Sequence, residues 1–286
     1  MCKFCSATVF IDTDAVERSR FCETFALWND PKTHGFAADA CVTVGGRTWA
    51  LGQRLGRGRS ADVHAATLAR VPTERVVIKL AHADADPGRL AREQEVLVAL
   101  QGSNAGGAAQ FTLRLPQPVV RGLVDGGKHD RRHALVLRWS SGFVHTLAQV
   151  RAVYPRGVTP RTAVWMLRRI LETLSFAHRS GVAHGGLCAT RLLVHPPEHG
   201  IMLVGWSDAT DATATACAGD IAAAARVVGT ALEGAATPTA LATALADLER
   251  PGAGQTDPWA VRERITQVAQ ECFGPPVFEH FKMPGW

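Results

Sequence analysis

The alternation of hydrophobic and polar residues divides the chain into a strand-rich first part and a helix-rich second part. Short alternating runs separated by turn residues predict strands, and a segment with leucines at helical spacing predicts one helix over 88–102. The strands are expected at 48–55, 62–68, 75–81, 118–125 and 133–139. This order predicts an α+β fold that starts with a five-stranded antiparallel sheet carrying a single helix.

The second part is mainly helical. Thr159 as N-cap and Pro160 at the first helical position begin a long amphipathic helix that is expected to end at Gly181. Strand-like runs on both sides of Pro196-Pro197 predict a hairpin, and the Ala/Thr-rich stretch 208–219 is expected to be a loop. Later helices are expected to begin at Asp220, at Thr237-Pro238 and at Asp257-Pro258, with the last one ending near Gly274.

The division into domains follows from these patterns. Residues 1–46 are expected to form a cysteine-containing extension with one short helix over 14–28. The extension ends at Gly45-Gly46, whose place between alternating residues indicates a hairpin turn. Two lobes are expected to follow, over 47–139 and 140–286.

A glycine-bearing hairpin and a strand lysine stand out in the first lobe. In LGRGRSADVHAATL, Gly56 and Gly58 would let backbone amides approach phosphates closely, and Val63 would then lie over an adenine. Lys79 lies on the third expected strand, and Glu93 is the acid of the following helix. A plain hairpin turn and a structural Lys79–Glu93 ion pair are the alternatives for these features.

In this order and context the features resemble the protein-kinase-like superfamily, over about residues 47–232. In that superfamily the strand lysine contacts the α- and β-phosphates of ATP and is held by the helix glutamate. The segment VAHGGLCATRLLVHPPEHGIMLVGWSDA (182–209) resembles its catalytic region, and also that of aminoglycoside-phosphotransferase-type kinases. The resemblance implies a two-lobed fold with a shortened helical lobe. The candidate nucleotide-binding residues are Gly56, Gly58, Val63, Lys79, Glu93, Leu137 and Arg191.

The chain departs from this family where the family does its chemistry. His184 matches the histidine that opens the catalytic loop, but Gly186, Arg191 and Gly205 stand where the family has the catalytic aspartate and two magnesium ligands. Glycine can neither accept a proton nor bind a metal, and a guanidinium offers only donors. From Gly205 to Asp220 the chain has only 15 residues, with no APE-like motif for a peptide platform. Magnesium-supported phosphoryl transfer is therefore not expected.

Two residues or groups of residues could compensate for the missing catalytic aspartate and magnesium ligands. Asp208 and Asp211 lie just beyond the lost metal ligand and could replace it. Arg191 could serve as a fixed cation over the phosphates, which would favour nucleotide binding without magnesium. The alternative for Arg191 is an exposed arginine or one paired with a nearby acid.

The cysteines and the overall charge narrow the function classes. Cys2 and Cys5 have the spacing of half a zinc site, and Cys22, Cys41 or His34 would have to complete it. Free thiols are the alternative. The net charge of +5, without a basic stripe, does not indicate nucleic-acid binding. No run of 18 apolar residues and no signal peptide are apparent, so a cytoplasmic protein without a membrane span is expected.

Three functions fit these observations. The first is a pseudokinase, a non-catalytic regulatory or scaffolding module that has a protein partner and holds a nucleotide without magnesium. The second is an atypical phosphotransferase acting on a small molecule or protein, and the third is a kinase fold whose cleft is filled by side chains. His178 and His184 are expected to be hydrogen-bonded core histidines rather than bases. The tail FGPPVFEHFKMPGW is expected to pack on the helical lobe, with an exposed docking peptide as the alternative.

Overall fold

The computed structural model describes residues 41–69, 71–250 and 255–283, which belong to two compact units. The first unit contains the strands of the first half of the chain, and the second contains the helices and the short strands between them. Helix α2 (Gly88–Gln101) groups with the helical unit, whereas the sequence assigned this helix to the first lobe. The helix expected over 14–28 lies outside the described residues.

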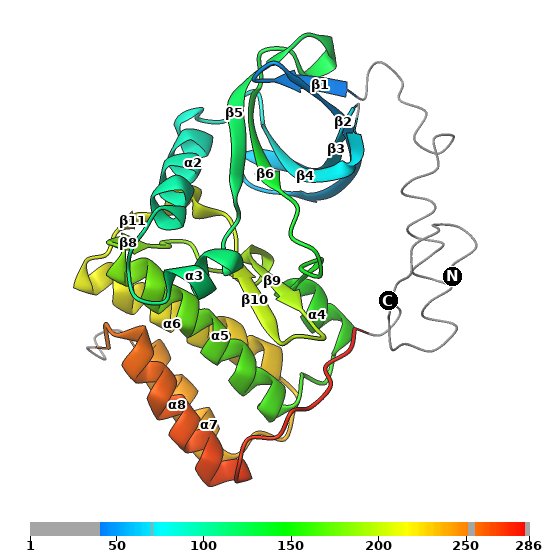
Figure 1. Cartoon of the computed structure of the whole chain (residues 1–286). Helices are drawn as coiled ribbons and strands as arrows, with labels where there is room; N and C mark the ends of the chain where they lie inside the picture. Colours follow the sequence, from blue (N-terminus) through cyan, green and yellow to red (C-terminus); the bar gives the residue numbers. More distant parts are fainter. Residues whose placement is uncertain (1–40, 70, 251–254, 284–286) are drawn as a thin grey trace. The chain divides into compact units, whose positions relative to one another are not determined.

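Among the described residues, six strands of the first unit form a closed barrel in the order β1, β2, β3, β4, β6, β5 (Figure 1). The strands are β1 (Cys41–Val44), β2 (Arg47–Arg57), β3 (Ala61–Leu68), β4 (Val71–Ala81), β5 (Pro118–Asp125) and β6 (His133–Arg138). A short 3-10 turn, η3 (Gly127–His129), lies between β5 and β6. All five strands expected from the sequence are present.

The expected number of strands is nevertheless wrong by one, because β1 comes from the segment assigned to the extension. This strand pairs with β2 across the turn at Gly45-Gly46, as those glycines indicated, and it also pairs with β5. Val42 and Val44 of β1 are buried in the barrel core. Their burial favours closure of the barrel, and closure removes the exposed edges that an open five-stranded sheet would have.

Alternation along the strands separates the apolar interior of the barrel from a second face. Val76, Ile78 and Leu80 on β4 belong to the core cluster inside the barrel. Successive side chains of a strand point to opposite faces of the sheet. Lys79 on β4, and Val63 that pairs with it on β3, therefore lie on the face opposite to this core.

The helical unit is built around α5 (Pro160–Arg179), which packs beside α6 (Ala214–Leu232) and α8 (Pro258–Phe273) (Figure 1). The other helices are α2, α3 (Ala108–Phe111), α4 (Leu147–Val153) and α7 (Thr239–Glu249). The short strands are β7 (His145–Thr146), β8 (Val182–Ala183), β9 (Leu192–His195), β10 (Gly200–Leu203) and β11 (Thr210–Asp211). The 3-10 turns are η2 (Thr112–Arg114), η4 (Ala189–Arg191) and η5 (Trp206–Asp208).

The start and end signals of two helices act as the sequence predicts. The Thr159 side chain caps α5 by accepting a hydrogen bond from the Thr162 amide at 3.1 Å, with Pro160 at the first helical position. Helix α8 begins directly after its cap Asp257 and ends before Gly274. The hairpin around Pro196-Pro197 is confirmed as the antiparallel pair β9–β10.

Helix α6 begins earlier than expected. Its N-cap is Thr213, which accepts a hydrogen bond from the Ala216 amide at 3.2 Å, so the second half of the expected loop 208–219 is helical. Asp220 is therefore a buried residue of the second turn and not the first residue of the helix. Only residues 206–213 separate Gly205 from α6, which is fewer than the sequence indicated.

The C-terminal segment, as far as residue 283, packs against the helical unit. Phe281 and Met283 are buried, and the ring of Tyr154 stacks on Phe281 at 5.5 Å between centroids. The Tyr154 hydroxyl donates to the Lys282 carbonyl, and His199 Nε2 bonds to a backbone carbonyl of the same segment. These contacts support the packed tail for residues 279–283, whereas Val277 and Phe278 earlier in the segment are exposed.

Within the described part of the chain, α6 is long and apolar enough to cross a membrane by length and composition alone. Its residues Ile221, Ala224 and Val228 are buried inside the protein. Core helices of soluble proteins pass the same test, so this helix is weak evidence for a membrane span.

Candidate functional site

The positions Gly186, Arg191 and Gly205 lie together in the helical unit. Gly186 follows β8, Arg191 is the last residue of η4, and Gly205 follows β10. The β9–β10 hairpin sets this arrangement, because beyond its last paired residues the Val204 amide donates to the Arg191 carbonyl at 2.9 Å. The three positions at which the sequence departs from the kinase pattern therefore form one site.

The Arg191 side chain fills the space that acidic side chains would need at the two glycines. A Cβ atom on Gly186 would overlap Nη1 of Arg191. A Cβ atom on Gly205 would lie 3.0 Å from Cδ and 3.1 Å from Nε of Arg191, closer than the usual carbon contact of about 3.5–4.0 Å. The three replacements are thus one packed arrangement, in which the glycines make room for the guanidinium.

Asp208 holds this guanidinium in place. Nη2 of Arg191 donates to Oδ2 of Asp208 at 2.6 Å, and Arg89 from α2 donates to Oδ1. Burial would raise the pKa of Asp208, but the hydrogen bonds and charges of the two arginines outweigh burial and lower this pKa. Arg191 is therefore the acid-paired arginine that the sequence left open as one alternative.

The same contacts determine what Asp208 can do as a replacement acid. Its Oδ2 lies 3.2 Å from the place of a Cβ atom at Gly186, so the carboxylate does reach the region of the missing aspartate. Both oxygens accept from arginine, however, and a lowered pKa makes the carboxylate a weak base. Asp211, the other candidate, is exposed on β11. The described residues contain no group of three or more His, Cys, Asp or Glu side chains that could hold a metal ion.

Two arginines of α2 bind the segment after Gly205. Arg89 also donates to the Ser207 hydroxyl at 3.3 Å, and Nε of Arg92 donates to the Ala209 carbonyl at 3.3 Å. Sequence analysis missed this role. The available signal was the spacing of the two arginines, three residues apart and so on one side of the helix.

A buried carboxylate on α6 fixes the start of the catalytic loop. Oδ2 of Asp220 accepts from the His184 amide at 2.7 Å, and Oδ1 accepts from the Gly185 amide at 3.0 Å. His178 Nε2 lies 3.0 Å from the same Oδ2. Asp220 stands alone as an acid in the apolar run CAGDIAAAARVV, and a buried acid requires such partners. That isolation was the sequence signal for this role.

His184 is part of the core and not a base. Its side chain is buried, its Nε2 lies 3.1 Å from the Val204 carbonyl oxygen, and burial lowers its pKa. His178 is held by Asp220. The expectation that both histidines are hydrogen-bonded core residues is confirmed.

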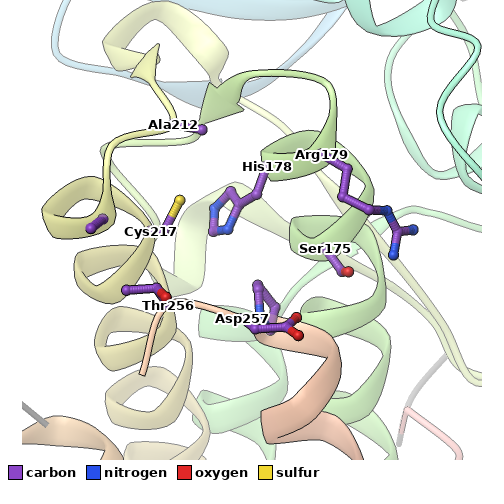
Figure 2. Close-up of a pocket in the computed structure, with 9 residues that line it drawn as sticks. Ser175, His178, Arg179, Ala212, Cys217, Thr256 and Asp257 are labelled. Carbon is purple, nitrogen blue, oxygen red and sulfur yellow. The ribbon is translucent and has the colours of Figure 1, made fainter. Parts of the chain in front are cut away.

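A cavity of about 310 Å³ lies elsewhere in the helical unit (Figure 2). Figure 2 shows His178 and Arg179 of α5, Cys217 of α6 and Asp257 at the start of α8 around it. The Asp257 carboxylate is engaged as a helix cap, since Oδ1 accepts from the Trp259 amide at 2.9 Å. No catalytic-loop residue lines the cavity, which is connected to that loop through the His178–Asp220 contact.

In the barrel unit, the strand register brings candidate nucleotide contacts onto one face. Val63 pairs with both Gly56 and Lys79, and Lys79 pairs with Leu135 on β6. Leu137 is two residues beyond Leu135 and so points to the same side of the sheet. Four of the candidates, distant in sequence, therefore share the outer face of the barrel.

Two other candidates are placed differently. The Gly58 amide donates to the Ala61 carbonyl at 2.8 Å within the hairpin, so it is not one of the free amides expected to meet a phosphate. Glu93 lies on α2 in the helical unit and is only 1% exposed. Its pairing with Lys79 stays a prediction.

The expected zinc site falls largely outside the described residues. Cys2, Cys5, Cys22 and His34 all lie there, while Cys41 is the first residue of β1 and a half-buried free thiol. Zinc binding by the extension therefore also stays a prediction.

Comparison with known proteins bears on the fold of the chain. A scan against protein-family models finds no match to the chain. A search of the curated proteins finds no match either. Among solved structures, that of vaccinia related kinase 3 is similar, with a TM-score of 0.59 and 17% identity, covering 82% of this chain and 91% of that one. Similarity at this level shows the fold, and the chain therefore has a protein-kinase-like fold.

Proposed function

We propose that the chain is a pseudokinase, a non-catalytic regulatory or scaffolding module that acts on a protein partner in the cytoplasm. The observation that carries the proposal is the Arg191 guanidinium, which lies against Gly186 and Gly205 and is held by Asp208. A positive charge fixed at this place repels Mg²⁺. Neither glycine supplies a group that takes a proton from an acceptor hydroxyl.

The short segment after Gly205 supports the same proposal. Residues 206–213 contain one 3-10 turn and the strand β11, which pairs with β8. Little chain is left to form a platform for a peptide substrate. The absence of such a platform argues against transfer to a peptide substrate.

Nucleotide binding without magnesium is the second part of the proposal. It is supported by the shared outer face of Val63, Lys79 and Leu137 on the barrel. ATP bound there would be held by apolar contacts to its base and by the Lys79 ammonium on its phosphates. No metal ion is needed for these contacts.

An atypical phosphotransferase is the alternative, and one observation favours it. Oδ2 of Asp208 lies near the region of the missing aspartate. Asp208 would have to separate from Arg191 and Arg89 before it could accept a proton.

Turnover of labelled ATP by the full chain tests the proposal. With Mg²⁺ and a panel of protein and small-molecule acceptors, we expect no turnover by the native chain. The variant Gly186→Asp/Arg191→Asn/Gly205→Asp restores the acidic pattern and removes Arg191 at once, so it should gain measurable turnover. Native turnover abolished by both Lys79→Met and Asp208→Asn would overturn the pseudokinase and support the alternative.

Thermal unfolding with ATP tests the nucleotide separately. ATP should raise the melting temperature equally with and without Mg²⁺, and Lys79→Met should remove most of that rise. Absence of any rise would reject nucleotide binding and leave the scaffold function standing.

A further inference from the structure

The interior of the barrel changes from apolar to polar at the end where β2 and β3 meet in the glycine hairpin. On β4 the interior row runs from Leu80 in the core to His82 just beyond the strand. On β3 it runs from Ala66 in the core through His64 to Asp62, which pairs with Leu80. Polar side chains therefore follow the core residues directly on two neighbouring strands.

Arginines surround this polar end. On β2, Arg54 pairs with His64 and Arg57 pairs with Asp62 in the strand register. Arg132, before β6, donates to the Ala81 carbonyl at 2.7 Å and lies 2.8 Å from Nδ1 of His129. The barrel-end cluster consists of Arg54, Arg57, Asp62, His64, His82, His129 and Arg132.

The carboxylate of Asp62 is too far from the cationic side chains of this cluster to form normal hydrogen bonds with them. Oδ1 of Asp62 lies 4.0 Å from Nη1 of Arg54 and 4.0 Å from Nε of Arg57. His82 Nε2 is 3.5 Å from the same oxygen, and Arg132 Nη2 is 3.7 Å from Oδ2. These separations exceed the 2.7–3.2 Å of a normal N–H···O hydrogen bond.

Three buried atoms of the cluster have no hydrogen-bond partner within the described part of the chain. They are Oδ1 of Asp62, Nδ1 of His64 and Nε2 of His82. Native proteins rarely leave such atoms without a partner, and a bound water or ion is a common reason when they do. Oδ1 of Asp62 only accepts hydrogen bonds and faces Nε2 of His82 at 3.5 Å, so the capacity of the cluster for an anion lies with its arginines and with protonated histidine nitrogens.

The charge of the cluster indicates the sign of that ligand. Three arginines and one aspartate give a net charge of +2 with the histidines neutral. Burial is the largest influence on the pKa of His64 and lowers it, a backbone hydrogen bond with Gly52 and the charge of Asp62 raise it, and the charges of Arg54 and Arg132 lower it. Arg54 and Arg57 are 57% and 69% exposed, so an anion in solution can reach them.

The cluster is distinct from the candidate nucleotide contacts. Asp62 and His64 point into the barrel, whereas Val63 between them points to the outer face with Lys79. Arg57 pairs with Asp62 and not with Val63, so its register assigns it to the interior side. A ligand at the cluster would not occupy the nucleotide face.

We propose that the barrel-end cluster binds a compact oxyanion, with a phosphate monoester as the best fit. The planar guanidinium groups of Arg54 and Arg57 present parallel N–H donors that match phosphate oxygens. Arg132 is positioned by two backbone carbonyls, Ala81 and Leu80, and supplies fixed positive charge behind them. Free phosphate and a phosphorylated side chain of a partner protein offer the same chemistry. The site does not depend on nucleotide binding or on catalytic status.

Titration of the full chain with inorganic phosphate and with O-phospho-L-serine, at constant ionic strength, tests this site. We expect saturable changes in the imidazole NMR signals of His64, His82 and His129. Arg54→Gln/Arg57→Gln should weaken binding about tenfold, because two charge-assisted contacts are lost from exposed positions. Asp62→Asn should strengthen binding several-fold, because it removes the single opposing charge.

Arg47→Gln is the matched control, since Arg47 lies on the same strand, is 55% exposed and changes the charge equally. An equal loss in this variant, or no saturable change in the native chain, would overturn the site. A capped phosphoserine peptide distinguishes the two sources of phosphate. If the peptide binds more tightly than inorganic phosphate, the natural ligand is a phosphorylated partner protein. If the two bind equally, the natural ligand is the free ion.

Discussion

Asp208 in the helical unit and Asp62 in the barrel unit are both single carboxylates among arginines, yet they are held differently. Arg191 donates to Asp208 at 2.6 Å, and Arg89 donates to its other oxygen. Around Asp62 the arginine nitrogens stand 3.7–4.0 Å away. Both oxygens of Asp208 accept hydrogen bonds, although Nη1 of Arg191 and Nε of Arg89 have no partner within the described residues. The arginines around Asp62 stand beyond hydrogen-bond distance from it.

The difference shows that charged side chains can have a structural role at the positions where the kinase pattern has its acids. In the helical unit, Arg191 donates to Asp208 and occupies the space beside Gly186 and Gly205. Within the described residues of the barrel unit, the nearest carboxylate oxygen stands 4.0 Å from the guanidinium groups of Arg54 and Arg57. Substitutions around Asp208, the first set of contacts, should therefore change stability, and substitutions around Asp62 should change ligand binding.

The largest effect is expected for Asp220, which anchors the loop that carries the first set. Asp220→Ala leaves the buried His184 amide and the Gly185 amide without their acceptor and should lower the free energy of unfolding by about 3–5 kcal/mol. Urea denaturation measures this loss. Asp211→Ala, at an exposed acid nearby, should stay within about 0.5 kcal/mol. A loss below 1 kcal/mol for Asp220→Ala would contradict the anchoring role.

A smaller effect is expected from filling the space beside Arg191. Gly186→Ala should cost about 1–3 kcal/mol, because the new Cβ overlaps Nη1 of Arg191 and displaces it from Asp208. In an Arg191→Ala background the same substitution should cost much less. The double-mutant cycle gives the coupling energy directly. Equal costs in the two backgrounds would show that Arg191 does not occupy this space.

The smallest effect is expected in the dependence of the unfolding free energy on acidic pH. The pKa of Asp208 is lowered from an ordinary value of about 3.8, so its ion pairs stabilise the fold above that pH. This stabilisation is lost as the pH falls through the lowered pKa of the folded state. The pKa of Asp62 is also lowered, since His82 and arginine outweigh its burial, but its cations stand farther away.

Unfolding free energies between about pH 5 and pH 2 separate the two acids. Asp208→Asn should flatten the acid dependence more than Asp62→Asn does. The reverse order would mean that Asp62 is the more tightly held carboxylate, and the comparison between the two units would fail.

Local signals in the sequence predicted most of the elements. Thr159-Pro160 and Asp257-Pro258 begin their helices because capping and the fixed φ of proline act within one turn. The alternation of apolar and polar residues located β2 to β6, because it is also a local signal, set by the two faces of a strand. Once neighbouring strands pair, the register places Val63, Lys79 and Leu137 on the same face of the sheet.

The remaining features depend on partners far away in the sequence. The Gly45-Gly46 turn indicated the β1–β2 hairpin, but the pairing of β1 with β5, some 80 residues later, has no local signal in the sequence. The Thr213 cap of α6 was hidden in an Ala/Thr-rich stretch that resembles a loop. The sequence showed that the acids were lost at Gly186 and Gly205, but it could not show that Arg191 had taken their space.

The backbone at Gly205 retains a left-handed conformation, with φ 81° and ψ 51°. Asp and Asn enter this region more readily than most other residues do. A side chain at 205 would nevertheless meet Cδ and Nε of Arg191, and a side chain at 186 would overlap Nη1 of the same residue. If the chain is the pseudokinase proposed above, acids at 186 and 205 can be accommodated only after Arg191 has been replaced by a smaller residue.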